Sequence, residues 1–167
     1  MSVVKTLILV RHAKSSWNSA AESDFDRPLN ERGKKDAPIV AQRVKDKISA
    51  IDAFVSSPAK RAKKTAQAFC EVFNSGEADL HFITKLYGAG VEDFQAVVAG
   101  LDDQWHTVAI FSHNPGITDF VNSLLESIRL DEMPTCGVFA VQCKVAKWQN
   151  FAQTEKDFLF FDYPKMQ

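Results

Sequence analysis

A short run of branched apolar residues that ends in an arginine and a histidine most constrains what this chain can fold into. Residues 4–10 read Val-Lys-Thr-Leu-Ile-Leu-Val, and Arg11 and His12 follow at once. Such a run is typical of a parallel strand that is covered on both faces. Open α/β sheets carry their chemistry at the carboxyl ends of these strands. Arg11 offers a planar set of donors for phosphate, and His12 offers a nucleophile or base near neutral pH.

Segments of strand and helix character alternate along the rest of the 167 residues. We expect strands at about 4–10, 53–56, 81–84, 107–112, 137–144 and 157–160. We expect helices at about 30–47, 58–73, 91–101 and 114–127. This order predicts an α/β fold with a single domain over residues 1–167. Its form is a three-layer α/β/α sandwich whose central sheet is mostly parallel, with one or two antiparallel strands at one edge.

Capping and proline residues set the expected helix boundaries. Asn30 is expected to cap the first helix, which runs to about residue 47. Pro38 lies inside that segment and is expected either to bend the helix or to mark a later start. Pro58 suits the first turn of the second helix. The apolar residues of the first helix that we expect to face inward are Ile39, Val40, Val44 and Ile48.

Composition excludes several other classes of protein. The net charge of −1 argues against a dominant surface for nucleic acid. Cys70, Cys136 and Cys143 stand in no zinc-like spacing and are expected to be free thiols in a reducing compartment. No apolar segment is long enough to cross a bilayer, and the amino-terminal one is interrupted by Arg11. We therefore expect a cytoplasmic protein that binds neither nucleic acid nor membrane.

Three segments that each contain or follow a predicted strand carry a specific pattern. Residues 11–18 read Arg-His-Ala-Lys-Ser-Ser-Trp-Asn, residues 56–66 read Ser-Ser-Pro-Ala-Lys-Arg-Ala-Lys-Lys-Thr-Ala, and residues 108–114 read Val-Ala-Ile-Phe-Ser-His-Asn. The first resembles the Arg-His-Gly-x-Thr-x-x-Asn signature of the histidine phosphatase superfamily, which is phosphoglycerate mutase-like. The second resembles its Ser-Ser-Pro-x-x-Arg-Ala-x-x-Thr-Ala element, and the third resembles the strand that delivers its second histidine. The resemblance spans nearly the whole chain.

This resemblance implies a phosphatase site at one edge of the sheet. His12 is expected to attack phosphorus and form a phosphohistidine intermediate. Arg11 and Arg61 are expected to hold the phosphoryl oxygens, and His113 to stabilise charge in the transition state. Four side chains then supply the charge stabilisation that magnesium gives elsewhere, so we expect no metal or cofactor, and phosphate or sulfate in the site. The candidate site residues are Arg11, His12, Ser15, Asn18, Arg61 and His113.

Two departures from the family pattern narrow the expected substrate. Many members carry a glutamate after a leucine-tyrosine-like segment as the acid that protonates the leaving alkoxide, and Gly88 stands at that place here. Without an acid, an alkoxide leaves poorly, whereas an imidazole leaves readily. Ala13 replaces the motif glycine. Together with the short chain, the missing acid resembles the SixA-type phosphohistidine phosphatases, although Glu92 or Asp93 remains an alternative acid.

Three functions stay open from the sequence alone. The leading one is a phosphatase that acts on phosphohistidine of a signalling protein, such as a histidine phosphotransfer domain or a phosphocarrier. The second is a small-molecule phosphomonoesterase that uses Glu92 or Asp93 as its acid. The third is a phosphate-recognising binding module without turnover. The presence of His12 argues against the binding module, because recognition needs the arginines but no nucleophile.

Overall fold

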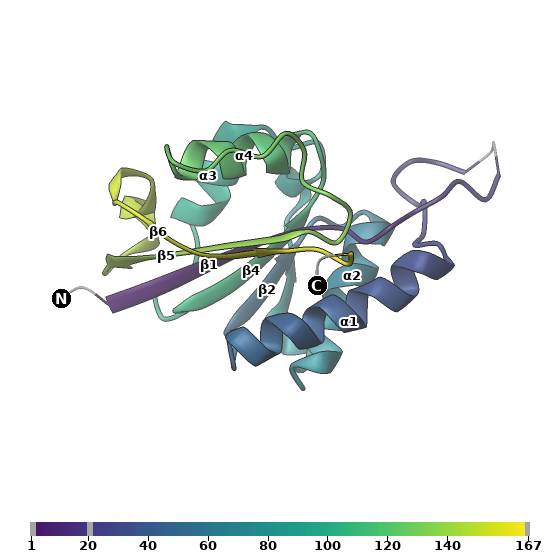
Figure 1. The fold of residues 1–167 in the computed structure, drawn as a ribbon, viewed down its shortest axis with the longest axis horizontal. Coiled ribbons are helices and arrows are strands. Elements are labelled where there is room, and N and C mark those ends of the chain that lie inside the picture. The colour runs from purple at the N-terminus through teal and green to yellow at the C-terminus, as the bar shows by residue number, and fades with distance from the viewer. Residues whose placement is uncertain (1–2, 20–21, 166–167) are drawn as a thin grey trace.

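The computed structural model describes residues 3–19 and 22–165. Within these ranges the strands form one sheet in the order β3-β2-β4-β1-β5-β6 (Figure 1). The strands are β1 (Val3–Arg11), β2 (Ala53–Ser56), β3 (Leu80–Phe82), β4 (Thr107–Ser112), β5 (Val138–Val145) and β6 (Asp157–Asp162). The four strands β1, β2, β3 and β4 pair with one another in parallel, whereas β5 and β6 are antiparallel and lie at one edge. The predicted mostly parallel sheet with antiparallel strands at one side is therefore confirmed.

Helices cover both faces of the sheet and complete the three layers (Figure 1). The α-helices are α1 (Glu31–Lys47), α2 (Lys60–Val72), α3 (Val91–Ala99) and α4 (Gly116–Leu124), and the short 3-10 helices are η1 (Glu77–Asp79), η2 (Thr84–Leu86) and η3 (Trp148–Gln153). Leu7 and Leu9 of β1 belong to the core that includes residues of α3 and α4. Ile8 and Val10 belong to the core that includes residues of α1 and α2. Alternate residues of one strand thus fill two cores, as expected for a sheet covered on both faces.

The first helix begins where the sequence predicted but packs differently. The side chain of Asn30 accepts a hydrogen bond from the Gly33 amide at 2.9 Å and caps α1. The helix runs through Pro38 without restarting, so of the two expected effects of Pro38 the later start is wrong. Ile39 is 54% exposed and does not face inward as expected. The buried stripe follows the helical period and consists of Gly33, Ala37, Val40, Ala41 and Val44.

Two other helix boundaries differ from the prediction. α2 begins at Lys60, so Pro58 precedes the helix instead of lying in its first turn. α4 ends at Leu124, earlier than the predicted residue 127. The cause lies in the loop that follows, because the Asn122 side chain donates to the Leu130 carbonyl at 2.8 Å and accepts from the Leu130 amide at 2.7 Å. These bonds fold the chain back before another helical turn can form.

Other expectations concern the thiols and the absence of a membrane span. Cys70, Cys136 and Cys143 are free, as predicted, and all three are buried. Burial raises the pKa of Cys70 to about 11, so this thiol is not a nucleophile at neutral pH. Over residues 3–19 and 22–165, we find no helix that combines the length and the apolar character needed to cross a membrane.

Candidate active site

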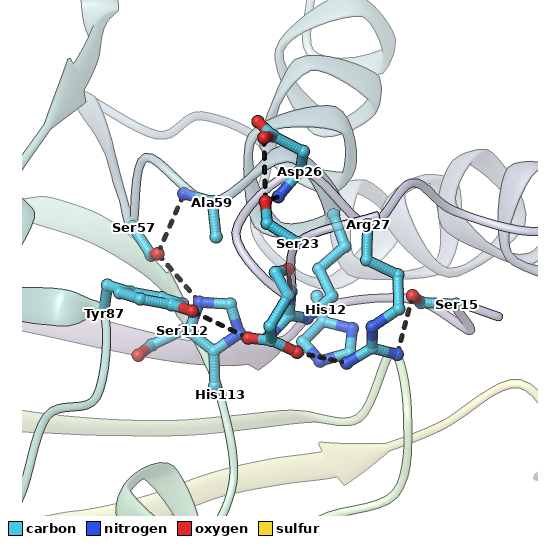
Figure 2. A network of polar contacts seen from close by, with 12 residues as sticks. His12, Ser15, Ser23, Asp26, Arg27, Ser57, Ala59, Tyr87, Ser112 and His113 are labelled. Carbon is cyan, nitrogen blue, oxygen red and sulfur yellow. Dashed lines mark hydrogen bonds and ion pairs between the residues drawn. The ribbon is translucent and has the colours of Figure 1, made fainter. Parts of the chain in front are cut away.

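The predicted site residues come together because three parallel strands end at the same edge of the sheet. Arg11 is the last residue of β1 and lies opposite Ser112 at the end of β4, which His113 follows. β2 ends beside β4, and Arg61 stands in the first turn of α2, shortly after β2. The His12 and His113 ring centroids are 5.2 Å apart. Figure 2 shows the Tyr87 ring against the His113 ring.

His12 is buried, with 5% of its surface exposed, and its tautomer follows from its contact. Nδ1 lies 2.8 Å from the Ala13 carbonyl oxygen. Because a carbonyl oxygen only accepts, Nδ1 carries the proton and Nε2 carries the lone pair. Burial lowers the pKa of His12 to about 3, and the nearby charges of His113, Arg61 and Arg11 act in the same direction. The ring is therefore neutral at neutral pH, with a nucleophilic nitrogen at Nε2.

His113 has one ring nitrogen anchored and the other unpaired. Its Nε2 lies 2.7 Å from Ser57 Oγ, and this oxygen accepts from the Ala59 amide at 3.2 Å. Burial, followed by the charge of Arg61, lowers the pKa of His113 to about 3. The Ser57 hydroxyl is free to donate to Nε2 of the neutral ring, and Nδ1 then carries the N–H. His113 is thus able to donate a hydrogen bond from Nδ1.

A buried threonine joins the first two motifs. The Thr65 hydroxyl accepts from the Ala13 amide at 2.9 Å and donates to the Arg61 carbonyl at 2.8 Å. Thr65 is fully buried in α2. On the other side of the loop, the His12 carbonyl accepts from the Cys136 amide at 3.0 Å. The segment that carries His12 is therefore fixed to α2 and to the chain just before β5.

Close packing also fixes the segment around Tyr87. The Ser112 hydroxyl donates to the Leu86 carbonyl at 2.6 Å, which ties the end of β4 to this segment. A Cβ atom on Gly116 would lie 1.8 Å from the Ala89 carbonyl oxygen, so only glycine fits at the start of α4. The Tyr87 ring packs edge-on against His113, with centroids 5.6 Å apart. Tyr87 is thereby positioned at the site.

Asp24 and Arg27 are site residues that the sequence reasoning missed. Arg61 donates to the Asp24 backbone carbonyl and, at 2.9 Å, to Asp24 Oδ2. Arg27 donates to Asp24 Oδ1 at 3.1 Å, and Tyr87 Oη donates to Oδ2 at 2.7 Å. In Figure 2 the dashed lines from Tyr87 and Arg27 lead to this one carboxylate. Burial alone would raise the pKa of Asp24, but the hydrogen bonds from Tyr87, Arg61 and Arg27 lower it to about 2.

Of the predicted phosphate-binding residues Ser15 and Asn18, only Ser15 contacts another residue of the site in the described parts of the chain. Ser15 Oγ accepts from Arg27 Nη1 at 2.9 Å, so Ser15 contacts an arginine of the site. Asn18 is exposed, and its backbone amide donates to Glu22 Oε2 at 2.9 Å. Over the part of the chain that is described, no hydrogen bond links Asn18 to the other candidate residues. Its contact with phosphate stays a prediction.

The buried side-chain polar atoms without hydrogen-bond partners all belong to this site. Among residues 3–19 and 22–165 they are Arg11 Nε, Arg27 Nε, Arg61 Nε and His113 Nδ1. Each buried and unpaired donor costs about 1–3 kcal/mol relative to a paired one. Three of the four atoms belong to guanidinium groups, which bind carboxylate and phosphate oxygens. The arrangement therefore suits an anion with several oxygen acceptors.

The position of the missing acid has an unusual backbone. Gly88 has φ of 71°, in the left-handed region that strains residues with a side chain. A glutamate would not be accommodated there without a change in the backbone. The two alternative acids lie at the start of α3, where Asp93 Oδ2 accepts from the Gly90 amide at 2.9 Å and Glu92 is exposed. Asp93 thus serves as a helix cap in this structure.

Comparison with known proteins identifies relatives of this chain. The sequence profile of the histidine phosphatase superfamily (branch 1) matches residues 7–86. An uncharacterized chloroplastic protein of Arabidopsis thaliana is 31% identical over 158 residues, which cover 89% of this chain and 71% of that protein. The match therefore extends well beyond the first two motifs.

Solved structures of the same fold agree with the sequence matches. A candidate phosphohistidine phosphatase SixA from Agrobacterium tumefaciens superposes with a TM-score of 0.78 at 27% identity, over 96% of this chain and 99% of that one. A protein histidine phosphatase SixA in complex with tungstate superposes with a TM-score of 0.79 at 20% identity, over 95% and 97% of the two chains. These relationships support phosphatase activity. This chain belongs to the histidine phosphatase superfamily, and its fold is SixA-like.

Proposed function

We propose that this chain removes the phosphoryl group from phosphohistidine on another protein, through a phosphohistidine intermediate on His12. The observation that carries the proposal is the state of His12. Its Nδ1 donates to the Ala13 carbonyl, and its pKa of about 3 keeps Nε2 unprotonated at neutral pH. The charges of Arg11 and Arg61 act on the His12 ring, and the charge of Arg27 acts on the His113 ring, whose centroid lies 5.2 Å away.

In the first step, the lone pair of His12 Nε2 forms a bond to phosphorus. The bond from phosphorus to the leaving nitrogen breaks, and its electron pair goes to that nitrogen. The arginines hold the equatorial oxygens, and His113 Nδ1 donates to one of them. These donors are fixed by the fold before the reaction begins, which is the condition for strong electrostatic stabilisation. Positive charge from side chains then offsets the charge of the phosphoryl group without a metal ion.

In the second step, a water oxygen attacks phosphorus and the bond to His12 Nε2 breaks. The electron pair returns to Nε2, and one water proton leaves with the phosphate or passes to solvent. The hydrogen bond from Nδ1 to the Ala13 carbonyl keeps the ring protonated on the side away from phosphorus. His12 therefore leaves as a neutral imidazole and needs no additional acid.

The same argument selects the substrate. An alkyl ester releases a basic alkoxide, which requires an acid, and Gly88 stands where many family members carry that acid. Phosphohistidine releases an imidazole, whose pKa near 6.5 makes it a far better leaving group. The fold shared with a protein histidine phosphatase supports this choice. We infer that the substrate is a signalling protein, either a histidine phosphotransfer domain or a phosphocarrier.

Rates on three classes of substrate test the proposal. The wild-type protein is assayed with a phosphohistidine-bearing phosphocarrier, an aryl phosphate and an alkyl phosphate, each with and without a chelator. We expect the phosphocarrier to react fastest, the alkyl phosphate slowest, and the chelator to have no effect. Comparable rates on all three would favour a phosphomonoesterase that uses Glu92 or Asp93 as its acid. Tight phosphate binding without turnover would favour the binding module.

A further inference from the structure

We propose that Asp24 determines specificity, by accepting a hydrogen bond from the N–H of the leaving imidazole of a phosphohistidine substrate. This inference rests on the proposed function and adds a residue that selects the leaving group. Asp24 lies in the loop between the first motif and α1, where no family motif marked it. Its contacts place it at the site.

The Asp24 carboxylate touches the side chains that surround the proposed phosphoryl position. Oδ2 accepts from Arg61 Nη2 at 2.9 Å and from Tyr87 Oη at 2.7 Å, and Oδ1 accepts from Arg27 Nη2 at 3.1 Å. The Tyr87 ring in turn contacts the His113 ring. Figure 2 shows the bonds from Tyr87 and Arg27 to this carboxylate, with the His113 ring against Tyr87. A phosphoryl group bound by these arginines therefore has the carboxylate close to it.

The carboxylate occupies only part of the arginine groups. Arg61 uses its two terminal nitrogens for Asp24, and Arg61 Nε has no partner. Arg27 uses one terminal nitrogen for Asp24 and the other for Ser15, and Arg27 Nε is also unpaired. The side chain of Asp24 is 44% exposed, so it faces both the arginines and solvent. These Nε atoms are buried, whereas Asp24 Oδ1, among the described residues, accepts from Arg27 alone and keeps a lone pair for a further N–H donor.

The charge of Asp24 is the reason that it discriminates between substrates. With a pKa of about 2, Asp24 is ionised at neutral pH and cannot donate a proton to a leaving group. An ionised carboxylate beside a phosphoryl group repels further negative charge. A leaving group is favoured there only if it brings a positive charge or an N–H to the carboxylate. Protonated phosphohistidine brings both, and a phosphate ester brings neither.

The first step is balanced without any proton transfer. The substrate ring carries phosphorus on one nitrogen and a proton on the other. When His12 Nε2 attacks, the bond from phosphorus to the substrate nitrogen breaks and its electron pair stays on that nitrogen. The ring keeps its N–H, which remains bonded to Asp24, and departs as neutral imidazole. With an ester, the electron pair instead creates an oxyanion that Asp24 repels.

The test compares two substrates on one pair of variants. Asp24→Asn removes the charge and keeps the size of the side chain, and its exposure makes loss of folding unexpected. Asp26→Asn is the matched control, because Asp26 lies in the same loop and bonds Ser23, not the arginines. The probes are phosphoimidazole and 4-nitrophenyl phosphate, and kcat/KM is measured for each. Thermal unfolding verifies that both variants are folded, and Asp24→Glu, which restores the charge, serves as a second variant.

We expect Asp24→Asn to lower kcat/KM for phosphoimidazole about tenfold, the effect of losing one hydrogen bond to a charged group. The ratio of kcat/KM for phosphoimidazole to kcat/KM for 4-nitrophenyl phosphate should therefore fall in Asp24→Asn. Asp24→Glu should recover part of this ratio, and Asp26→Asn should resemble the wild type. An equal fall on both probes would overturn the inference, because Asp24 would then only hold the arginines. An equal rise would also overturn it and make the carboxylate a competitor of substrate. A wild type that prefers the ester refutes the proposed function itself, and the inference with it, whereas an unchanged ratio in Asp24→Asn refutes the inference alone.

Discussion

Replacing Thr65 with valine isolates the contact between the two main motifs. Valine has nearly the shape of threonine but lacks the hydroxyl that accepts from the Ala13 amide at 2.9 Å. The Arg61 carbonyl also loses its hydrogen bond from this hydroxyl, but it still accepts the helical hydrogen bond from the N–H of residue 65. Since Ala13 and Thr65 are fully buried, the Ala13 N–H is left unpaired out of reach of water. We expect the free energy of unfolding to fall by about 1–3 kcal/mol.

Activity should fall as well, because the same residue that loses its amide partner holds the nucleophile. The Ala13 carbonyl accepts from His12 Nδ1 at 2.8 Å, so a shift of Ala13 reorients the His12 ring. We expect kcat to drop about tenfold, less than the hundredfold that a displacement of 1 Å costs. Urea unfolding and phosphatase kinetics measure the two effects. Thr65→Ser keeps the hydroxyl and is the control that should retain kcat.

The result that would refute this reasoning is a stable and active Thr65→Val. A change in unfolding free energy below about 0.5 kcal/mol is what surface substitutions away from special features produce. Such a value would mean that the Ala13 amide does not depend on Thr65. Equal losses of kcat in Thr65→Val and Thr65→Ser would likewise assign the effect to packing instead of the hydroxyl.

Three further predictions concern the arginines and the histidines. Arg61→Lys keeps the charge but loses the planar pair of donors, so kcat/KM should fall by about 30-fold or more, equivalent to roughly 2–4 kcal/mol; full activity would show that only charge matters. Because His12 and His113 have pKa values of about 3 in the folded protein, against about 6.5 when unfolded, the unfolded chain binds more protons between these values. The free energy of unfolding should therefore be highest above pH 6.5 and fall as the pH is lowered towards 3. Urea titrations at fixed pH values measure it, and a value that does not change with pH would contradict the buried neutral rings. Tungstate should raise the melting temperature of the wild type and have a smaller effect on Arg61→Ala, and equal shifts would place the anion elsewhere.

The sequence predicted the sheet, and also that Arg11, His12, Arg61 and His113 would come to one edge of it, because both depend on local patterns. The apolar run before Arg11 and the one before His113 identify buried parallel strands, and parallel strands bring their carboxyl ends together. The spacing of the second motif placed Arg61 at the start of a helix. The prediction that Ile39 faces inward was wrong. The residue next to a buried helical residue lies about 100° around the helix axis, so the buried stripe that includes Val40 leaves Ile39 exposed.

Asp24, Arg27 and Tyr87 were missed because long-range contacts bring them to the site. The loop that carries Asp24 is held by a bond from the Lys60 amide to the Phe25 carbonyl at 2.9 Å. Phe25 also packs against Tyr87, with ring centroids 5.2 Å apart. These contacts join residues far apart in the sequence, and no periodicity records them. The sequence signal that was available is the opposite charge of Asp24 and Arg27 in a loop that follows the first motif.

The central claim is that His12 carries the phosphoryl group, and trapping that intermediate tests it most directly. The wild type and His12→Ala are mixed with a phosphohistidine-bearing phosphocarrier, quenched in alkali to preserve phosphohistidine, and digested for mass spectrometry. We predict an acid-labile phosphate on His12 in the wild type, since Nε2 is the unprotonated nitrogen at the site. We also predict a folded but inactive His12→Ala without trapped phosphate. Phosphate on another residue, or turnover by His12→Ala, would contradict the account.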